Sequence, residues 1–572
     1  MFRKNDQHQQ AYLFSSVNEL PEKQRERLEK SWAATFYQDF FSRIDEDSFA
    51  VLYSDKASRP NIPVNVLVSV EALKAGFGWS DAELEEQMAF NIQTRYALGY
   101  RDLTVGQFEL RTVYNFRRRL AQYMQETGQN LLDAAFEEVT DEQISVLKLK
   151  TGKLRMDSVQ IAGNIRQMSR LQLLVEVLQR AWRMLNEVDQ ARYAGVFEPY
   201  TKGTSGQYTY HLEPGEGHSH LEAIGALMQQ LVSELAADYG KDAAYAVLER
   251  VYHEHFVEVE QELRPKAGAE LSAQSLQSPD DWDATYRQKR GVGYQGYVTN
   301  VTETCDPDNG LQLIVKVQTE SNDTDDARML NDAVPNLVER TAVDELHTDG
   351  GYNSAAVDAT LNANGIEQFQ TAIRGAQAAT DRLSVSDFEF TRDDEGTPQT
   401  VTCPQGHQVE VVTARNDQRF TALFDASMGD GCPLLAQCPT RSLRKKPGRV
   451  LRFSQQAVHV AHRRANQRQA KASGRNLRSA VEATVRSLKH PFGNAKLPVR
   501  GHIRVSLTMV ASAAMTNVRR IWRYQTGKTG VETAPLAAEN RSTRTVFHLF
   551  RAFLRPFSRW FATPSHHQAA VA

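Results

Sequence analysis

Apolar side chains recur every three or four residues through the first 145 residues, which is the spacing of one face of an α-helix. Two stripes consist of Val66, Val70, Leu73 and Phe77, and of Leu110, Val113, Phe116 and Leu120. Between them, Ser80 and Glu83 have the spacing of a helix capping box, and an apolar face is expected to continue from Leu84 to Tyr96. The pattern predicts a helical domain over residues 1–145.

Three consecutive basic residues accompany the second stripe: Arg117, Arg118 and Arg119. Short helices that end in a basic helix are typical of helix-turn-helix-like DNA-binding domains. A helical bundle with a basic edge in solvent would give the same pattern, so both interpretations stay open.

The period of the pattern changes near residue 146. Alternation from Val146 to Ile161 predicts a hairpin around Thr151 and Gly152, with Asp157 in its second strand. An acid within an apolar strand costs free energy unless it is paired or binds a metal. An aspartate at a strand edge that faces solvent is the simpler alternative.

Helical spacing returns over residues 166–279, and strands are then expected at 297–302 and 311–319. A helix over 326–340 and a short strand from Glu345 follow, and this strand ends at Asp349. The alternation of strands and helices predicts an α/β fold. Active sites of such folds lie at the carboxyl ends of strands, which makes Asp349 a candidate site residue.

Residues 375–454 are expected to form a β-rich insertion that contains three of the four cysteines. Cys403 precedes His407 by four positions, and Cys432 precedes Cys438 by six. Thiolate and imidazole ligands favour tetrahedral zinc, although this spacing is loose and ordinary reduced cysteines would also explain it. Four cysteines in 572 residues do not make a disulfide framework, which favours a reducing cytoplasm.

A helix is predicted from Arg475 to Lys489, since this stretch contains neither Pro nor Gly. Arg475, Arg478, Glu482 and Lys489 are spaced by three, four and seven residues and share one face. A carboxylate among fixed cations is either part of a solvated ion pair or part of a helix that crosses a groove for a polyanion.

Charge is unevenly distributed along the chain. From Thr440 to the end there are 26 Lys and Arg against 3 Asp and Glu, a net charge of +23, and the remainder has 41 against 67, a net charge of −26. This asymmetry indicates a nucleic-acid partner, unless the basic part is held by the protein's own acidic parts. No membrane partner is expected, because the longest apolar run, Val505–Val518, is interrupted by polar residues.

From about Phe40 to Arg523 the sequence resembles DDE-type insertion-sequence transposases of the IS-four/IS-five superfamily, in the branch with a helical domain before the catalytic core. The core motifs that carry this resemblance are Arg155-Met-Asp157-Ser158, Thr348-Asp349-Gly-Gly-Tyr352 and Arg478-x3-Glu482-x6-Lys489. Arg475 stands where the family signature has Tyr. Shorter similarities in the helical domain are Tyr53-Ser-Asp, Arg59-Pro60 and Arg95-Tyr-Ala-Leu-Gly99.

The resemblance implies an RNase H-like catalytic core in which Asp157, Asp349 and Glu482 bind two Mg²⁺ or Mn²⁺ ions. Arg475, Arg478 and Lys489 would contact DNA phosphates. The implied partners are the double-stranded DNA of the element ends and of the target, with a homodimer in the synaptic complex, in the cytoplasm at the nucleoid. Two other functions stay open: a catalytically silent DNA-binding regulator, and an RNase H-like nuclease that cuts without joining.

The expected organisation has five parts, of which the core is discontinuous. They are a helical N-terminal domain (1–145) for DNA ends, the core (146–165, 280–374 and 455–525), a helical insertion (166–279), a β-rich insertion with a zinc site and a basic loop (375–454), and a basic aromatic tail (526–572).

Overall fold

The computed structural model describes the chain except for residues 11–14, 55, 57–59, 214, 290, 373–380, 394–395, 414–418, 445, 473, 475, 494–495 and 528–572. Met1–Trp522 form one compact unit, and the second unit starts at Arg523. Arg59, Arg475 and the tail expected over 526–572, apart from its first two residues, lie outside the described part.

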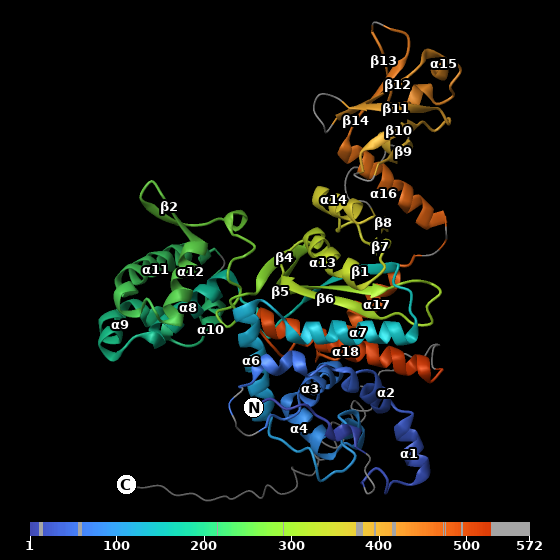
Figure 1. Ribbon diagram of the computed structural model, residues 1–572. Coiled ribbons are helices and arrows are strands. Elements are labelled where there is room, and N and C mark those ends of the chain that lie inside the picture. The colour runs from blue at the N-terminus through green and yellow to red at the C-terminus, as the bar shows by residue number, and fades with distance from the viewer. Residues whose placement is uncertain are drawn as a thin grey trace, which may run out of the picture. The chain divides into compact units, whose positions relative to one another are not determined.

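Helices dominate the N-terminal part, as the periodicity predicts (Figure 1). The Ser80–Glu83 capping box is present, with both reciprocal hydrogen bonds. The apolar face from Leu84 to Tyr96 does not belong to one helix, because Asn91 ends one helix and caps the next. The helices are α1 (Glu22–Glu29), α2 (Trp32–Asp39), α3 (Val64–Phe77), α4 (Asp81–Phe90), α5 (Ile92–Ala97), α6 (Leu110–Thr127) and α7 (Leu131–Leu147).

A mixed sheet follows, in the order β4-β5-β1-β7-β8, with β6 also paired to β5. Strand β5 is antiparallel to β1, β4 and β6, whereas β7 is parallel to both β1 and β8. The strands are β1 (Lys153–Ile161), β4 (Thr285–Lys289), β5 (Val292–Thr304), β6 (Ile314–Ser321), β7 (Glu345–Thr348) and β8 (Glu367–Gln370).

The hairpin expected around Thr151 and Gly152 is wrong in its first strand. Val146 and Leu147 form the last turn of α7, and Lys148 ends that helix in the left-handed conformation at φ 53°. The second strand exists, and its partners come from β5 and β7 rather than from the preceding residues.

Helices cover both faces of this sheet (Figure 1). On one face α7, α17 (Ser479–Lys489) and α18 (His502–Gln525) share a core with Ile161 and Val301. On the other face α13 (Asp326–Arg340) and α14 (Ala355–Ala363) pack on Leu154 and Met156. Since successive side chains of a strand point to opposite faces, Arg155 and Asp157 of β1 face the α17 side.

A separate helical core lies between β1 and β4 in sequence. Its buried residues come from several helices and from a two-stranded hairpin. These elements are α8 (Arg170–Met184), α9 (Glu187–Thr201), α10 (Ser205–Tyr210), α11 (Gly217–Tyr239), α12 (Ala243–His255), β2 (Phe256–Val259) and β3 (Glu262–Pro265).

A second sheet follows β8, with the order β13-β14-β12-β11-β10-β9 and its own apolar core. Helix α16 (Gln455–Ala472) leads back to the first sheet, where Arg463 pairs with Asp358 and Asn466 donates to the Gln368 carbonyl. The expected mixed helix-and-sheet class is therefore confirmed. The remaining elements are β9 (Glu389–Arg392), β10 (Pro398–Thr402), β11 (Gln408–Thr413), β12 (Arg419–Phe424), α15 (Ala426–Gly429), β13 (Arg441–Ser442) and β14 (Arg449–Ser454).

Candidate active site

One guanidinium joins two acids that are far apart in the sequence. Nη2 of Arg478 donates to Oδ1 of Asp157 at 3.0 Å, and Nη1 donates to Oε1 of Glu482 at 3.2 Å. Helix α17 begins at Ser479 rather than at Arg475, so Arg478 occupies the N-cap position and Glu482 lies in the first turn. The side chains of Arg478 and Asp157 are 14% and 12% exposed, whereas Glu482 is 63% exposed, so the pair is largely buried and Glu482 faces solvent.

Strand pairing brings the third acid to the same level of the sheet. The parallel register pairs Arg155 with His347, so two residues further on Asp157 and Asp349 are level. Asp349 directly follows β7, and its Oδ1 accepts the backbone N–H of Gly351 at 2.6 Å. The expected position of Asp349 at a strand end is therefore confirmed.

The carboxylates influence one another electrostatically. Burial raises the pKa of Asp157, Arg478 opposes this effect, and the negative charge of Asp349 adds to it. Burial alone would lower the pKa of Arg478, but Asp157, Asp349 and Glu482 raise it above its usual value. Arg478 is thus the common counter-ion of all three acids.

The acids do not form a metal site as they stand. Within the described ranges, no group of three or more His, Cys, Asp or Glu side chains is arranged to hold a metal ion. Carboxylate oxygens are nevertheless the donors that Mg²⁺ and Mn²⁺ prefer, so the chemistry of the donor set fits these ions.

Lys489 lies on the same helix but faces the protein. Its Nζ donates to the Gln160 carbonyl at 3.0 Å, which ties the end of α17 to the end of β1. Burial lowers the pKa of Lys489. Arg475, expected on the same face, lies outside the described residues.

The three arginines of α6 differ in their surroundings. Arg117 bonds to Glu71 at 2.7 Å and to Asp81 at 3.1 Å, so it links α6 to α3 and α4. Arg119 is exposed and stacks over the Tyr53 ring at 4.9 Å, and Arg118 is exposed as well.

The candidate zinc ligands all lie in the β-rich segment. Cys403 and His407 flank the β10–β11 turn, where the Cys403 N–H donates to the His407 carbonyl at 2.9 Å. Cys432 and Cys438 follow α15, and Sγ of Cys438 lies 3.1 Å from Oγ1 of Thr440. All three cysteines are partly buried and reduced, and the described residues do not assemble these four side chains around an ion.

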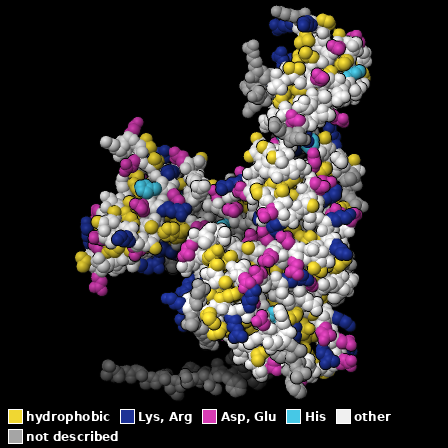
Figure 2. Space-filling view, viewed as in Figure 1, with side chains coloured by type: hydrophobic (Ala, Val, Ile, Leu, Met, Phe, Trp, Pro, Cys, Tyr) yellow, Lys and Arg dark blue, Asp and Glu magenta, His cyan; other side chains and the backbone are white. Residues whose placement is uncertain are grey.

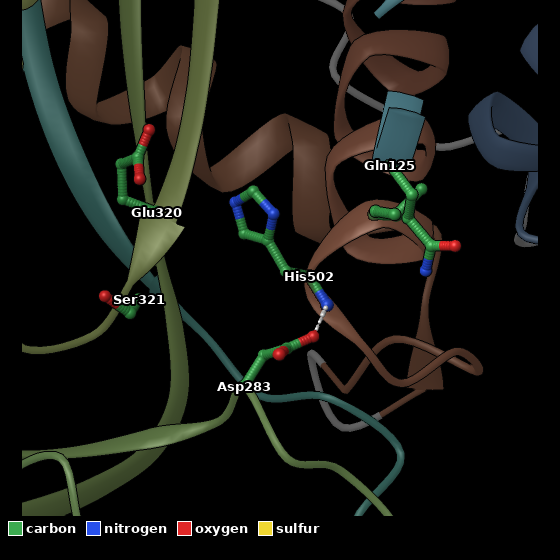
Figure 3. A pocket seen from close by; sticks show the side chains of 6 residues that line it. Gln125, Asp283, Glu320, Ser321 and His502 are labelled. Atoms are coloured by element: carbon green, nitrogen blue, oxygen red, sulfur yellow. Dashed lines mark hydrogen bonds between the residues drawn. The ribbon is translucent and has the colours of Figure 1, made fainter. Parts of the chain in front are cut away.

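A cavity of about 510 Å³ lies elsewhere on the surface (Figure 3). His502 lies beside Asp283 there, and its backbone N–H donates to Asp283 Oδ2 at 3.1 Å. The cavity contains none of the three acids at Arg478. Its lining residues are Gln125, Asp283, Glu320, Ser321, His502 and Ile503.

The surface does not present one uniform basic field. On the face shown in Figure 2, Asp and Glu side chains are interspersed with Lys and Arg.

None of the helices in the described part is long and apolar enough to cross a membrane.

Sequence reasoning missed a fourth acid, Glu303, which is fully buried in β5. Its only signal in the sequence is an acid within a strand, the same signal that identified Asp157. Its partners come from β1, α17 and α18, and no local pattern indicates them.

Two protein-family models match parts of the chain. One is described as a transposase DDE domain and matches residues 402–522, and the other as a transposase domain (DUF772) and matches residues 24–119. The first match contains Glu482, whereas Asp157 and Asp349 lie outside both. No curated protein and no solved structure matches the chain. The two family matches support a DDE transposase family.

Proposed function

We propose that this protein is a DNA transposase that cuts at the ends of its insertion sequence and joins them to target DNA. Asp157, Asp349 and Glu482 are the catalytic acids of this proposal. The two transposase family matches support the class, and the arrangement of acids at one guanidinium supports the site.

The observation that carries the proposal is the contact of Arg478 with both Asp157 and Glu482. Asp157 and Glu482 are 325 positions apart in the sequence, and Asp349 joins them through the β1–β7 register. Buried charge is costly, so acids that meet away from any structural need favour a functional explanation.

The topology favours an RNase H-like core. Its support is a mixed sheet in which β5 and β6 are antiparallel and β7 and β8 parallel to their neighbours, with helices on both faces. The IS-four/IS-five assignment rests on the sequence motifs alone.

Two divalent ions, Mg²⁺ or Mn²⁺, are the proposed cofactors, with Asp157, Asp349 and Glu482 as their ligands. When bound, such ions activate the attacking oxygen and stabilise the leaving oxygen of a phosphoryl transfer. Arg478 bonds to one oxygen of each of two of these acids, Oδ1 of Asp157 and Oε1 of Glu482, so bound ions would compete with the guanidinium for these oxygens.

Arg478 then has a second role in the proposal. A guanidinium released from two carboxylates can donate a fork of hydrogen bonds to a phosphate next to the scissile bond. Lys489 stays with the Gln160 carbonyl and fixes α17 to β1, so its proposed role moves from phosphate contact to support.

The proposed partners are double-stranded DNA of the element ends and of the target, and a second copy of the chain in the synaptic complex. Arg118 and Arg119 are exposed on α6 and are proposed to contact DNA. Cys403, His407, Cys432 and Cys438 are proposed to hold one structural Zn²⁺. The first two lie between β10 and β11 and the last two between β12 and β13, in connections of the same sheet.

Two alternative functions predict different reaction products. A silent regulator would bind end DNA without cutting it, and an RNase H-like nuclease would cut without joining. The experiment is a strand-transfer assay with paired inverted repeats taken from the DNA that flanks the gene, in Mg²⁺ or Mn²⁺. Cut and joined products support a transposase, whereas cut products alone support the nuclease and binding alone supports the regulator.

A further inference from the structure

A buried carboxylate lies behind the three acids and accepts hydrogen bonds from three elements. Glu303 of β5 has a side chain that is 0% exposed. Its Oε1 accepts from Arg155 Nε at 2.6 Å, and its Oε2 accepts from Arg520 Nη1 at 2.7 Å. The Thr484 hydroxyl lies 3.0 and 2.8 Å from the two carboxylate oxygens.

These partners are the near neighbours of the catalytic acids. Arg155 lies two positions before Asp157 on the same face of β1, and Thr484 lies two positions after Glu482. Arg155 also donates through Nη1 to the carbonyl of Leu477 at 2.9 Å, the residue before Arg478. The network therefore holds α17 at both sides of the Arg478–Glu482 segment.

The pairing of β5 with β6 is irregular at this point. Thr302 pairs with Lys316 and Glu303 with Ile314, so the register skips Val315 of β6. The pairing of β5 with β1 stays regular here and places Glu303 directly opposite Arg155. Glu303 is therefore level with the arginine that it binds.

The chemistry of Glu303 differs from that of the other acids. Burial alone would raise its pKa, but Arg520 and Arg155 keep the pKa below its usual value, so the group is ionised. Both oxygens already accept from arginine and threonine donors, which leaves Glu303 unsuited to hold an ion.

We propose that Glu303, through Arg155, Thr484 and Arg520, is a positioning residue that sets the start and the rotation of α17, so that Glu482 and Arg478 face Asp157. This inference rests on the proposed function of that site. A misplacement of about 1 Å at a reacting group costs about 100-fold in rate, so loss of one link should slow chemistry more than binding.

The test uses Thr484, because Glu303→Ala would leave the buried Arg155 and the partly buried Arg520 without their counter-ion and would destabilise this layer. Thr484→Val replaces the hydroxyl by a methyl group of similar size and so removes its bonds to Glu303 and Arg520, and Thr484→Ser keeps the hydroxyl. Thr319→Val is the matched control, since its buried hydroxyl bonds to Thr299 at 2.9 Å within the same sheet. Single-turnover cleavage of paired-end DNA, its Mn²⁺ dependence and the DNA affinity are measured for the full chain.

Thr484→Val should cleave about 10- to 100-fold more slowly and need more Mn²⁺, with unchanged DNA affinity, and Thr484→Ser should restore both. Wild-type behaviour of Thr484→Val, no rescue by Thr484→Ser, or equal slowing by Thr319→Val would each overturn the proposal.

Hydrogen exchange of the α17 amides separates this proposal from the proposed function. Faster exchange over Ser479–Lys489 in Thr484→Val, and not in Thr319→Val, is expected even if the wild-type protein cuts no DNA. Failure of wild-type cleavage alone would contradict the function, and unchanged exchange would contradict the positioning role.

Discussion

Arg478 donates to Asp157 at 3.0 Å across a sequence separation of 321 residues. This contact ties the first residue outside α17 to the middle of β1. The same guanidinium also donates to Glu482, so the positive charge of one side chain balances two carboxylates that would otherwise repel each other. Several expected outcomes depend on this relationship.

Removal of the guanidinium should make the fold depend more on divalent ions. Arg478→Ala leaves Asp157, Asp349 and Glu482 without their common counter-ion, so we expect a lower Tm in metal-free buffer. Added Mg²⁺ should then raise Tm more than in the wild type, because bound ions replace the lost positive charge. Differential scanning calorimetry with and without Mg²⁺ measures both shifts.

Arg486→Ala is the control, since Arg486 is exposed on the same helix. It should leave the Mg²⁺ shift unchanged. Equal Mg²⁺ shifts in wild type and in Arg478→Ala would contradict the role of Arg478 as counter-ion.

Stability should depend on pH through Asp133 of α7. Burial, together with the charge of Glu137, raises the pKa of Asp133 to about 7, and its Oδ1 has no hydrogen-bond partner in the described structure. The folded state therefore binds more protons than the unfolded state from about pH 4 to 7, and stability falls as pH rises through this window.

Asp133→Asn removes this titration and should stabilise the protein at pH 8 by about 2 kcal/mol, which is less than the full shift because the residue is only half-buried. Urea unfolding at pH 8 and at pH 4 checks the difference, which should disappear at pH 4. Glu320→Gln is the control, and it measures how much the loss of another acid with a raised pKa changes the unfolding free energy at the same pH. An Asp133→Asn protein that is no more stable than wild type at pH 8 would count against this assignment.

Arg117 and Arg118 should separate structure from DNA binding. Arg117→Ala breaks ion pairs to Glu71 and Asp81 that are less than one third exposed, and should cost about 1–3 kcal/mol of unfolding free energy. Arg118→Ala should leave stability unchanged and reduce the salt dependence of DNA binding by about one phosphate contact. DNA titrations across a salt series measure the effect of each variant on binding, and urea unfolding measures its effect on stability. A stable Arg117→Ala protein with weaker DNA binding, or a destabilised Arg118→Ala protein, would contradict these roles.

The cysteine-rich segment gives a metal-content prediction. If Cys403, His407, Cys432 and Cys438 bind zinc, freshly purified reduced protein carries about one zinc per chain, and chelation increases hydrogen exchange in residues 381–454. Cys432→Ser should lose the zinc, and Cys305→Ser, at a buried thiol of the core, should keep it. Zinc-free wild-type protein would leave these residues as ordinary thiols.

Some elements of the fold could be predicted from the local sequence pattern. The helix over 326–340 and the position of Asp349 after a strand agree with the structure, because Asp325 caps α13 and apolar spacing fixes its length. The false hairpin strand at Val146 shows the limit of this approach, since alternation over five residues also fits the last turn of a helix.

The site itself required contacts that no local pattern contains. Arg478 and Glu482 were identifiable by spacing, but the inward direction of Lys489 and the ion pairs of Arg117 depend on elements far along the chain. Glu303 is the clearest case, because Arg155, Thr484 and Arg520 are 148, 181 and 217 residues away from it.

The central claim is that Asp157, Asp349 and Glu482 together perform phosphoryl transfer. Single-turnover cleavage of paired-end DNA in Mg²⁺, at saturating protein, tests it most directly with Asp349→Asn against Asp344→Asn, two acids at opposite ends of β7. We expect Asp349→Asn to abolish cleavage and joining while it keeps DNA affinity, as Asp157→Asn should also do, and Asp344→Asn to cut at the wild-type rate. Cleavage by Asp349→Asn or Asp157→Asn as fast as by the wild type would contradict the account.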